Sequence, residues 1–145
     1  MDKDFKEFIA LLNENQVEYL IVGGYAVTIH GHPRFTGDLD IWVNATPENA
    51  HKVLKTVEAF GFSSYGLTIA DFQNPDNVLQ MGYPPFRIDV MGSISGNLNF
   101  EICRQNRKTL MIEDIPFHFI GFEDLLINKK ASGRRKDLDD LENLA

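Results

Sequence analysis

Two aspartates interrupt an apolar run in the segment Gly37-Asp-Leu-Asp-Ile-Trp-Val43. The alternation predicts a β-strand, because residues two apart in a strand point to the same face of a sheet. Asp38 and Asp40 then share one face, and the core face carries three apolar residues, Leu39, Ile41 and Val43. Aspartate is disfavoured in strands. The segment therefore restricts the fold to a sheet with one face that keeps carboxylates accessible.

A further carboxylate is expected beside this pair. In Arg87-Ile-Asp-Val-Met91, Arg87 and Asp89 share a face while their apolar neighbours point inward. If the two strands are adjacent, three carboxylates meet, and two unit charges about 4 Å apart repel by roughly 4 kcal/mol at an effective dielectric near 20. Protons or cations would neutralise such a patch, and Mg²⁺, which prefers oxygen ligands, suits it best. The alternative is that Asp38 and Asp40 are solvated residues on the exposed face of an edge strand.

Two glycines, Gly23 and Gly24, follow the apolar run 19–22 and precede a predicted short helix that ends at Gly31. Backbone N–H groups at such a turn, with the helix N-terminus behind them, bind anions, and glycine lets a phosphate approach the main chain closely. The alternative is a tight strand-to-helix connection without a ligand. The pattern fits neither a P-loop nor a Gly-x-Gly-x-x-Gly turn.

The remaining patterns predict one domain, residues 1–145, of mixed α/β (α+β) class, with a mixed central sheet flanked by helices. Helical periodicity follows Phe5 to Leu12, and Thr46-Pro47 begins a helix that ends at Gly61. The segment 63–77 has no clear pattern. Further strands are expected at 77–83, 86–92 and, around a turn at 113–114, in 108–120; further helices are expected at 97–105 and, broken at Gly133, in 121–145.

Together these motifs resemble the signature of the DNA polymerase β-like nucleotidyltransferase superfamily: Gly23-Gly24, a spacer, Asp38-Leu39-Asp40-Ile41, and a third aspartate, Asp89. The strings 23–43 and 124–144 are similar to small bacterial nucleotidyltransferase-like proteins related to the toxins of abortive-infection toxin–antitoxin systems. The most specific part is Arg-x-Thr-x-Asp-Leu-Asp, residues 34–40. The resemblance implies the polymerase β-like nucleotidyltransferase fold.

The resemblance also implies the roles of individual residues. Asp38, Asp40 and Asp89 are expected to be catalytic and to hold two Mg²⁺ ions, for which Mn²⁺ can substitute. Residues expected to bind the nucleotide are Gly23, Gly24, Arg34, Thr36, Lys129 and Asp137.

Lys129 belongs to a basic segment in an otherwise acidic chain. Five cationic residues fall within residues 129–136: Lys129, Lys130, Arg134, Arg135 and Lys136. Some of them are expected to reach a triphosphate. The alternative is simpler: cations late in one helix and acids early in the next are favoured by the helix dipole.

The function expected from these features is metal-dependent transfer of a nucleoside monophosphate from an NTP to an acceptor hydroxyl. The acceptor stays open between tRNA or another RNA end, a protein side chain and a small molecule, and a chain of this size favours a partner protein chain that recognises the acceptor. One alternative is a catalytically weak nucleotide-binding or regulatory module with the same fold. Another is a metal-dependent phosphoesterase, which would leave Gly23-Gly24 and Lys129 without a role.

Composition limits the partners and the cellular compartment that can be expected for this chain. The net charge of -7 gives no overall attraction to nucleic acid, although a local basic groove is compatible with it. The single cysteine, Cys103, excludes an internal disulfide framework, and the chain has no apolar run of about 18 residues. A cytoplasmic protein without a membrane partner is therefore expected.

Overall fold

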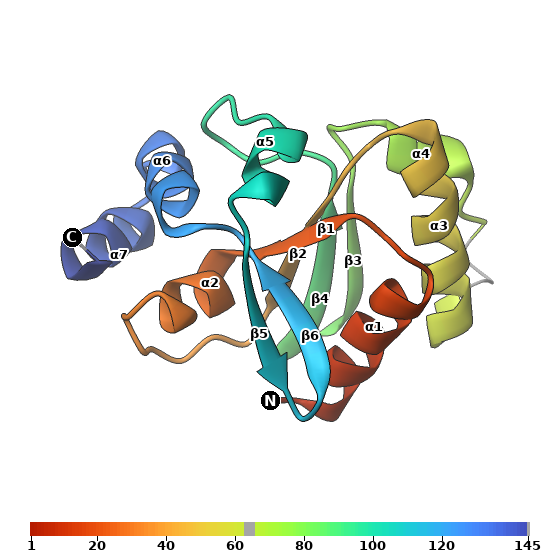
Figure 1. The fold of residues 1–145 in the computed structure, drawn as a ribbon, viewed down its shortest axis with the longest axis horizontal. Coiled ribbons are helices and arrows are strands. Elements are labelled where there is room, and N and C mark those ends of the chain that lie inside the picture. Colours follow the sequence, from red (N-terminus) through yellow and green to blue (C-terminus); the bar gives the residue numbers. More distant parts are fainter. Residues whose placement is uncertain (63–65, 145) are drawn as a thin grey trace.

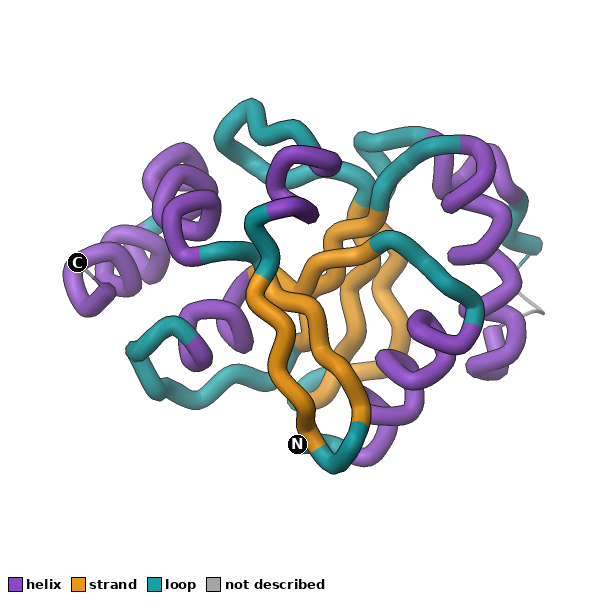
Figure 2. The backbone as a smooth tube through the Cα atoms, in the orientation of Figure 1, coloured by secondary structure: helices purple, strands orange, loops and turns teal. Residues whose placement is uncertain are grey.

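A six-stranded mixed sheet runs through the centre of the protein (Figure 2). The computed structural model describes residues 1–62 and 66–144. The strand order is β3-β4-β2-β1-β6-β5, which confirms the expected mixed central sheet. The strands are β1 (Tyr19–Val22), β2 (Leu39–Val43), β3 (Val78–Tyr83), β4 (Phe86–Met91), β5 (Lys108–Ile112) and β6 (Ile115–Phe119).

Helices cover both faces of this sheet (Figure 1). On one side lie α1 (Lys3–Glu14), α3 (Pro47–Val57), which continues into the π-helical turn η1 (Glu58–Phe62), and α4 (Ile69–Gln73). On the other side lie α2 (Gly23–Ile29), α5 (Phe100–Gln105), α6 (Phe122–Ser132) and α7 (Arg135–Leu144). Within residues 1–62 and 66–144, no helix is long and apolar enough to cross a membrane.

The register of the central strands brings the aspartates together. β2 pairs in parallel with β4 and antiparallel with β1, so that Asp40 lies directly opposite Asp89 on one side and Val22 on the other. Leu39 and Ile41 are fully buried on the opposite face of β2. The alternation of the sequence is thus reproduced by the structure, and β2 is a central strand rather than an edge strand.

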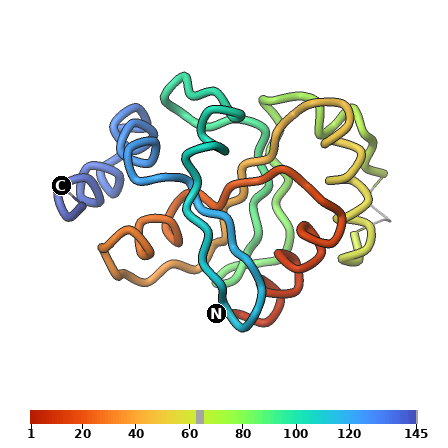
Figure 3. The backbone as a smooth tube through the Cα atoms, viewed as in Figure 1, coloured from red at the N-terminus to blue at the C-terminus, as the bar shows by residue number. Residues whose placement is uncertain are grey.

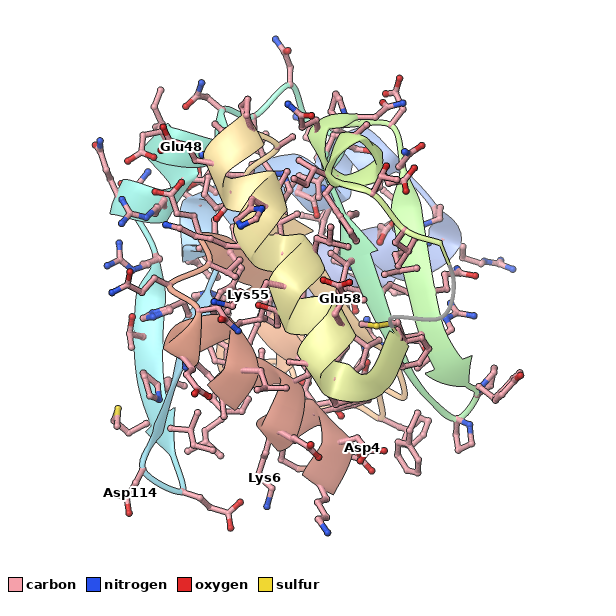
Figure 4. All side chains as sticks on the ribbon, turned by 90° about the vertical axis from the view of Figure 1, so that its right-hand side faces the viewer. Asp4, Lys6, Glu48, Lys55, Glu58 and Asp114 are labelled. Carbon is pink, nitrogen blue, oxygen red and sulfur yellow. The ribbon has the colours of Figure 1, made fainter. Side chains whose placement is uncertain are left out.

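The core on the far face is formed by α1 and α3, which pack against each other. The apolar stripe of α1, Phe5, Phe8, Ile9 and Leu12, is fully buried, as its helical spacing predicts. In Figure 4 the charged residues Glu48, Lys55 and Glu58 lie along the outward side of the helical segment that covers the sheet, and all three are exposed. This side of the molecule therefore has an ordinary packed core and a solvated outer surface.

The segment without a clear pattern contains one helix that the sequence reading missed. α4 begins after Thr68, whose side chain and backbone N–H are bonded to the Asp71 carboxylate in a capping box. The Thr-x-x-Asp spacing was the available signal. Part of the same segment, residues 63–65, lies outside the described residues, as does the C-terminal residue 145 of the predicted final helix.

The buried side-chain amide of Asn49 holds the backbone at the position where β1 begins. The side chain of Asn49 is 2% exposed; it accepts a hydrogen bond from the backbone N–H of Glu18 at 2.8 Å. Its Nδ2 donates to the carbonyls of Glu18 at 3.0 Å and Asn44 at 2.8 Å. One side chain of α3 therefore satisfies the chain ends where β1 begins and β2 finishes.

We expect Asn49→Ala to lower the free energy of unfolding by roughly 2–4 kcal/mol, because it removes three part-buried hydrogen bonds to the backbone of Glu18 and Asn44. Urea denaturation measures the change. Asn143→Ala, which removes an exposed amide bonded within α7, is the matched control and is expected to change stability by less than about 0.5 kcal/mol. A similar small loss for both variants would contradict the role given to Asn49.

Candidate active site

The three predicted aspartates meet at one end of the β2–β4 pair. Asp40 and Asp89 are register partners on parallel strands, and Asp38 immediately precedes β2. Arg87, two residues before Asp89, connects Asp89 with Asp38. Its Nε donates to Asp89 Oδ1 at 2.8 Å, and its Nη2 donates to Asp89 Oδ2 and to Asp38 Oδ2, each at 3.1 Å. The cluster therefore contains one cation that the sequence reading did not assign to it.

Asp40 has a different environment from its two neighbours. Burial raises the pKa of its carboxyl, and the negative charges of Asp89 and Asp38 raise it further, to about 6; Lys136 and Lys129 oppose this rise. Arg87 forms ion pairs with Asp38 and Asp89. The repulsion among the three carboxylates is therefore least compensated at Asp40. A bound cation would relieve this repulsion.

Glycines are required where α2 meets this cluster. Gly23 has a φ of +67°, and a Cβ at this position would lie 2.1 Å from Oδ2 of Asp40. A Cβ on Gly24 would lie 2.3 Å from Oγ1 of Thr36. The Gly-Gly pair therefore lets the turn approach both the carboxylates and the Arg-x-Thr loop closely.

A chain of ion pairs connects the last two helices with the loop before β2. Nζ of Lys129 in α6 donates to Asp137 Oδ1 at 3.0 Å and lies 3.1 Å from Asp140 Oδ2, both in α7. Arg34 donates to both oxygens of Asp140, at 2.9 and 3.1 Å. Arg134 donates to Asp137 from its Nε at 2.7 Å. Three cations thus share two carboxylates, which leaves this network with one excess positive charge.

The middle of this network is buried. The side chains of Lys129, Asp137 and Asp140 are 3%, 0% and 2% exposed. Burial alone would raise the pKa of Asp137, but hydrogen bonds from Arg134 and Lys129 outweigh it and lower the pKa to about 2. Asp137 is therefore ionised at neutral pH and holds its cations permanently. In Figure 3 the C-terminal helices return to the side of the molecule that carries the loop after α2, where Arg34 lies.

Two clefts meet at Asp40. The larger, about 560 Å³, lies between the β2–β4 carboxylates and α6, and its lining includes Gly23, Asp89, Lys129 and Arg134. Residues of the β4–α5 connection, Ser93, Ile94 and Ser95, complete it. The smaller cleft, about 290 Å³, is lined by Gly24, Arg34, Phe35, Thr36, Gly37, Asp38, Asp40, Pro85 and Lys136. A wall of carboxylates thus faces cationic side chains across the larger cleft, as a metal-bound polyphosphate requires.

The predicted site residues are therefore divided between these two clefts. Asp40, Asp89, Gly23 and Lys129 line the larger one; Asp38, Gly24, Arg34 and Thr36 line the smaller one. Asp137 is buried and accepts a hydrogen bond from Lys129. As the side chains stand, residues 1–62 and 66–144 contain no group of three His, Cys, Asp or Glu arranged to hold a metal ion. Arg87 draws Asp38 and Asp89 toward itself.

Three participants were missed at the sequence level: Arg87, Arg134 as a partner of Asp137, and Asp140. Asp140 follows Asp137 at a spacing of three residues, so its place on the same face of α7 was predictable, but its partners were not. The position of Arg87 on the Asp89 face was predicted from alternation. Its ion pairs depend on the neighbouring strand.

A cleft with carboxylates and cationic side chains in its lining, at one end of two parallel strands, is chemically suited to a nucleoside polyphosphate. The chain belongs to the family described as "Nucleotidyltransferase of unknown function (DUF6036)", which matches residues 2–145. The match confirms the expected nucleotidyltransferase and its transferase class.

Solved structures show the same fold. The lincosamide antibiotic adenylyltransferase LnuA, determined with lincomycin bound, matches at 16% identity over 99% of this chain and 96% of its own, with a TM-score of 0.59. A candidate nucleotidyltransferase from Thermotoga maritima matches at 13% identity, with a TM-score of 0.64, over 95% of this chain and 88% of its own. An antigenic nucleotidyltransferase-like protein from Paracoccidioides brasiliensis matches at 17% identity and a TM-score of 0.56, covering 99% and 74%. A comparison with curated protein sequences gave no match.

In metal-free buffer, we expect Asp40→Asn to raise the free energy of unfolding at pH 7 by about 2 kcal/mol. The pKa of Asp40 in the folded protein is about 6, above its ordinary value of 3.8. Its contribution to stability is therefore fully present below about pH 4 and is lost as the pH rises through 6. Urea denaturation with EDTA at several pH values measures this. The difference between variant and wild type should grow from pH 4 to 7; a constant difference would contradict the assignment.

We expect Lys129→Ala to lower the free energy of unfolding by about 1.5–3 kcal/mol, because it removes one cationic partner from each of the buried carboxylates of Asp137 and Asp140, which keep only Arg134 and Arg34. Lys130 is exposed and adjacent in the helix, so that Lys130→Ala is the matched control, with an expected change below about 0.5 kcal/mol. Thermal or urea denaturation compares the two. Equal effects would mean that the buried ion pairs contribute little to the attachment of α7.

Proposed function

We propose that this nucleotidyltransferase transfers a nucleoside monophosphate from an NTP to an acceptor hydroxyl, and that the transfer depends on a divalent metal. The observation that supports it most directly is the pairing of Asp40 with Asp89 on parallel strands, across a cleft from Lys129 and Arg134. In the reaction, the acceptor oxygen forms a bond to the α-phosphorus, the bond from that phosphorus to the bridging oxygen breaks, and pyrophosphate leaves with the electron pair.

The carboxylates fit a divalent cation chemically. Asp38, Asp40 and Asp89 offer hard oxygen ligands, which Mg²⁺ and Mn²⁺ prefer. Burial, and then the charges of Asp89 and Asp38, raise the pKa of Asp40, so a cation beside this carboxylate would favour its ionised form. When bound, two ions would neutralise developing charge on the attacking and leaving oxygens. Asp89, opposite Asp40, is the residue we propose to accept the proton of the acceptor hydroxyl.

The two clefts can hold different parts of one nucleotide, because both reach Asp40. The larger one has the space and the cations for a triphosphate: Lys129 and Arg134 on one wall, and the Gly23 turn beside Asp40. In this arrangement Lys129 acts mainly through the fixed charge of its network, because both of its ion pairs are with aspartates. Gly24, Arg34 and Thr36 would bind the nucleotide where it extends past Asp40 into the smaller cleft.

The acceptor is proposed as a class rather than as a compound. LnuA is a lincosamide antibiotic adenylyltransferase; for this chain the proposed acceptors are an RNA end, a protein side chain and a small molecule. A toxin-like role, with a partner chain that supplies acceptor recognition, and a cytoplasmic location remain part of this proposal.

The test is transfer of radioactive label from each of the four α-³²P ribonucleoside triphosphates to components of a cell extract, with Mg²⁺, with Mn²⁺ and with EDTA. We expect label in an acceptor fraction with metal and none with EDTA. Digestion with nuclease or protease, and size fractionation, then identify the acceptor class. Label transferred without metal, or hydrolysis without any labelled acceptor, would contradict the proposal, the latter in favour of a phosphoesterase.

Two variants sharpen the result. Asp40→Asn removes a carboxylate of the cluster and is expected to reduce transfer at least a hundredfold. Asp114→Asn removes an exposed aspartate in the β5–β6 turn, labelled in Figure 4, that lines neither cleft, and is expected to leave transfer unchanged. Equal activity of the two variants would exclude Asp40 from the reaction, whereas nucleotide binding without any transfer by the wild type would favour a nucleotide-binding module.

A further inference from the structure

Arg87 is the only cation that contacts the aspartate cluster directly among the described residues 1–62 and 66–144. Its guanidinium engages both oxygens of Asp89 and one oxygen of Asp38, with distances of 2.8 to 3.1 Å. The side chain of Arg87 is 26% exposed, whereas that of Asp89 is only 10% exposed. The arginine is therefore more accessible to solvent than the carboxylate that it binds.

These contacts use the same oxygens that a metal ion would need. A carboxylate oxygen that accepts a charge-assisted hydrogen bond from a guanidinium has lost much of its availability as a ligand. Both oxygens of Asp89 are engaged in this way, and so is Oδ2 of Asp38. Asp40, by contrast, has no ion pair within the part of the chain that the structure describes. The cluster thus has one carboxylate ready for a cation and two that are held by an internal one.

We propose that Arg87 is a resident counter-cation that competes with divalent metal for Asp38 and Asp89, so that metal binds weakly alone and tightly together with a nucleoside triphosphate. This inference rests on the proposed function, because it assigns the metal to the same cluster. Arg87 is then a positioning residue that sets the order of loading, rather than a catalytic residue.

The coupling between metal binding and nucleotide binding follows from the ligands that the phosphate oxygens supply to the metal. A bare ion must displace Arg87 from at least one carboxylate before the cluster can surround it. An ion that arrives with a triphosphate carries part of its ligand set in the phosphate oxygens and depends less on Asp38 and Asp89. The released guanidinium also gains an anion that it can face, since the phosphates add negative charge at the same place. By linkage, nucleotide and metal must then strengthen each other's binding by the same factor.

A fixed arginine would give the opposite behaviour. If Arg87 served only to hold Asp38 and Asp89 in the geometry that a metal needs, its removal would weaken metal binding. The sign of the change in metal affinity therefore separates the two roles. Neither sign depends on measuring catalysis.

The experiment is calorimetric titration of Mn²⁺ into the protein, alone and with saturating non-hydrolysable α,β-methylene analogues of the four ribonucleoside triphosphates. The variants are Arg87→Gln, which keeps a hydrogen-bonding side chain but no charge, and Arg87→Lys, which keeps the charge but loses the forked contact. Arg104→Gln is the matched control, because Arg104 also pairs with two carboxylates, those of Glu18 and Glu101, outside both clefts. Asp40→Asn reports on the metal site itself.

We expect Arg87→Gln to bind Mn²⁺ alone about tenfold more tightly than wild type, with a smaller further gain from the nucleotide analogue. Arg87→Lys should lie between them, and it keeps the test decisive if Arg87→Gln does not fold without metal. Arg104→Gln should match wild type. Unchanged or weaker Mn²⁺ binding in both Arg87 variants, or an equal gain in Arg104→Gln, would overturn the inference while leaving the proposed function intact. Wild-type affinity in Asp40→Asn would instead show that the metal site, and with it the proposed function, is misassigned.

Discussion

The buried contact of Lys129 with Asp137 and Asp140 is the interaction on which the arrangement of the site depends. It fastens α7 to α6, and Arg34 extends it to the loop that precedes β2. Both clefts have one wall on the sheet and another wall supplied by this network or by the helices that it joins. Without it, the carboxylates of β2 and β4 would still be adjacent, but no cationic surface would face them. A buried ion pair contributes little net stability on average, so its value here lies in fixing position.

The two groups of carboxylates have opposite electrostatic environments. Asp137 and Asp140 are fully compensated by cations, and the pKa of Asp137 is lowered accordingly. Asp40 is under-compensated, and its pKa is raised. The first group is held by buried ion pairs, and the second includes a carboxylate, Asp40, that has no ion pair among the described residues. Opposite shifts in residues of the same chemical type, a short distance apart, are a common feature of functional sites.

Much of this architecture was accessible from the sequence, because the backbone follows simple periodicities. Alternation identified the strands that carry Asp40 and Asp89, and helical spacing identified the buried stripe of α1. The partners of charged side chains were not accessible, since they lie far apart along the chain: Lys129 looked like a free phosphate ligand and is a buried residue with two aspartate partners. α4 was missed because its five residues are too few to show a period. Arg87 was placed on the correct face, but its bond to Asp38 required knowledge of the strand order.

The late position of α7 in the chain has a genetic consequence. All six strands and the carboxylates of β2 and β4 are encoded before Gly133, whereas both aspartates that hold Lys129 and Arg34 are encoded after it. A stop codon just beyond Gly133 would spare the sheet and remove the anionic half of the ion network. A frameshift between Gly133 and Asp137 is therefore expected to act as a loss-of-function allele, although it leaves every carboxylate of β2 and β4 in place.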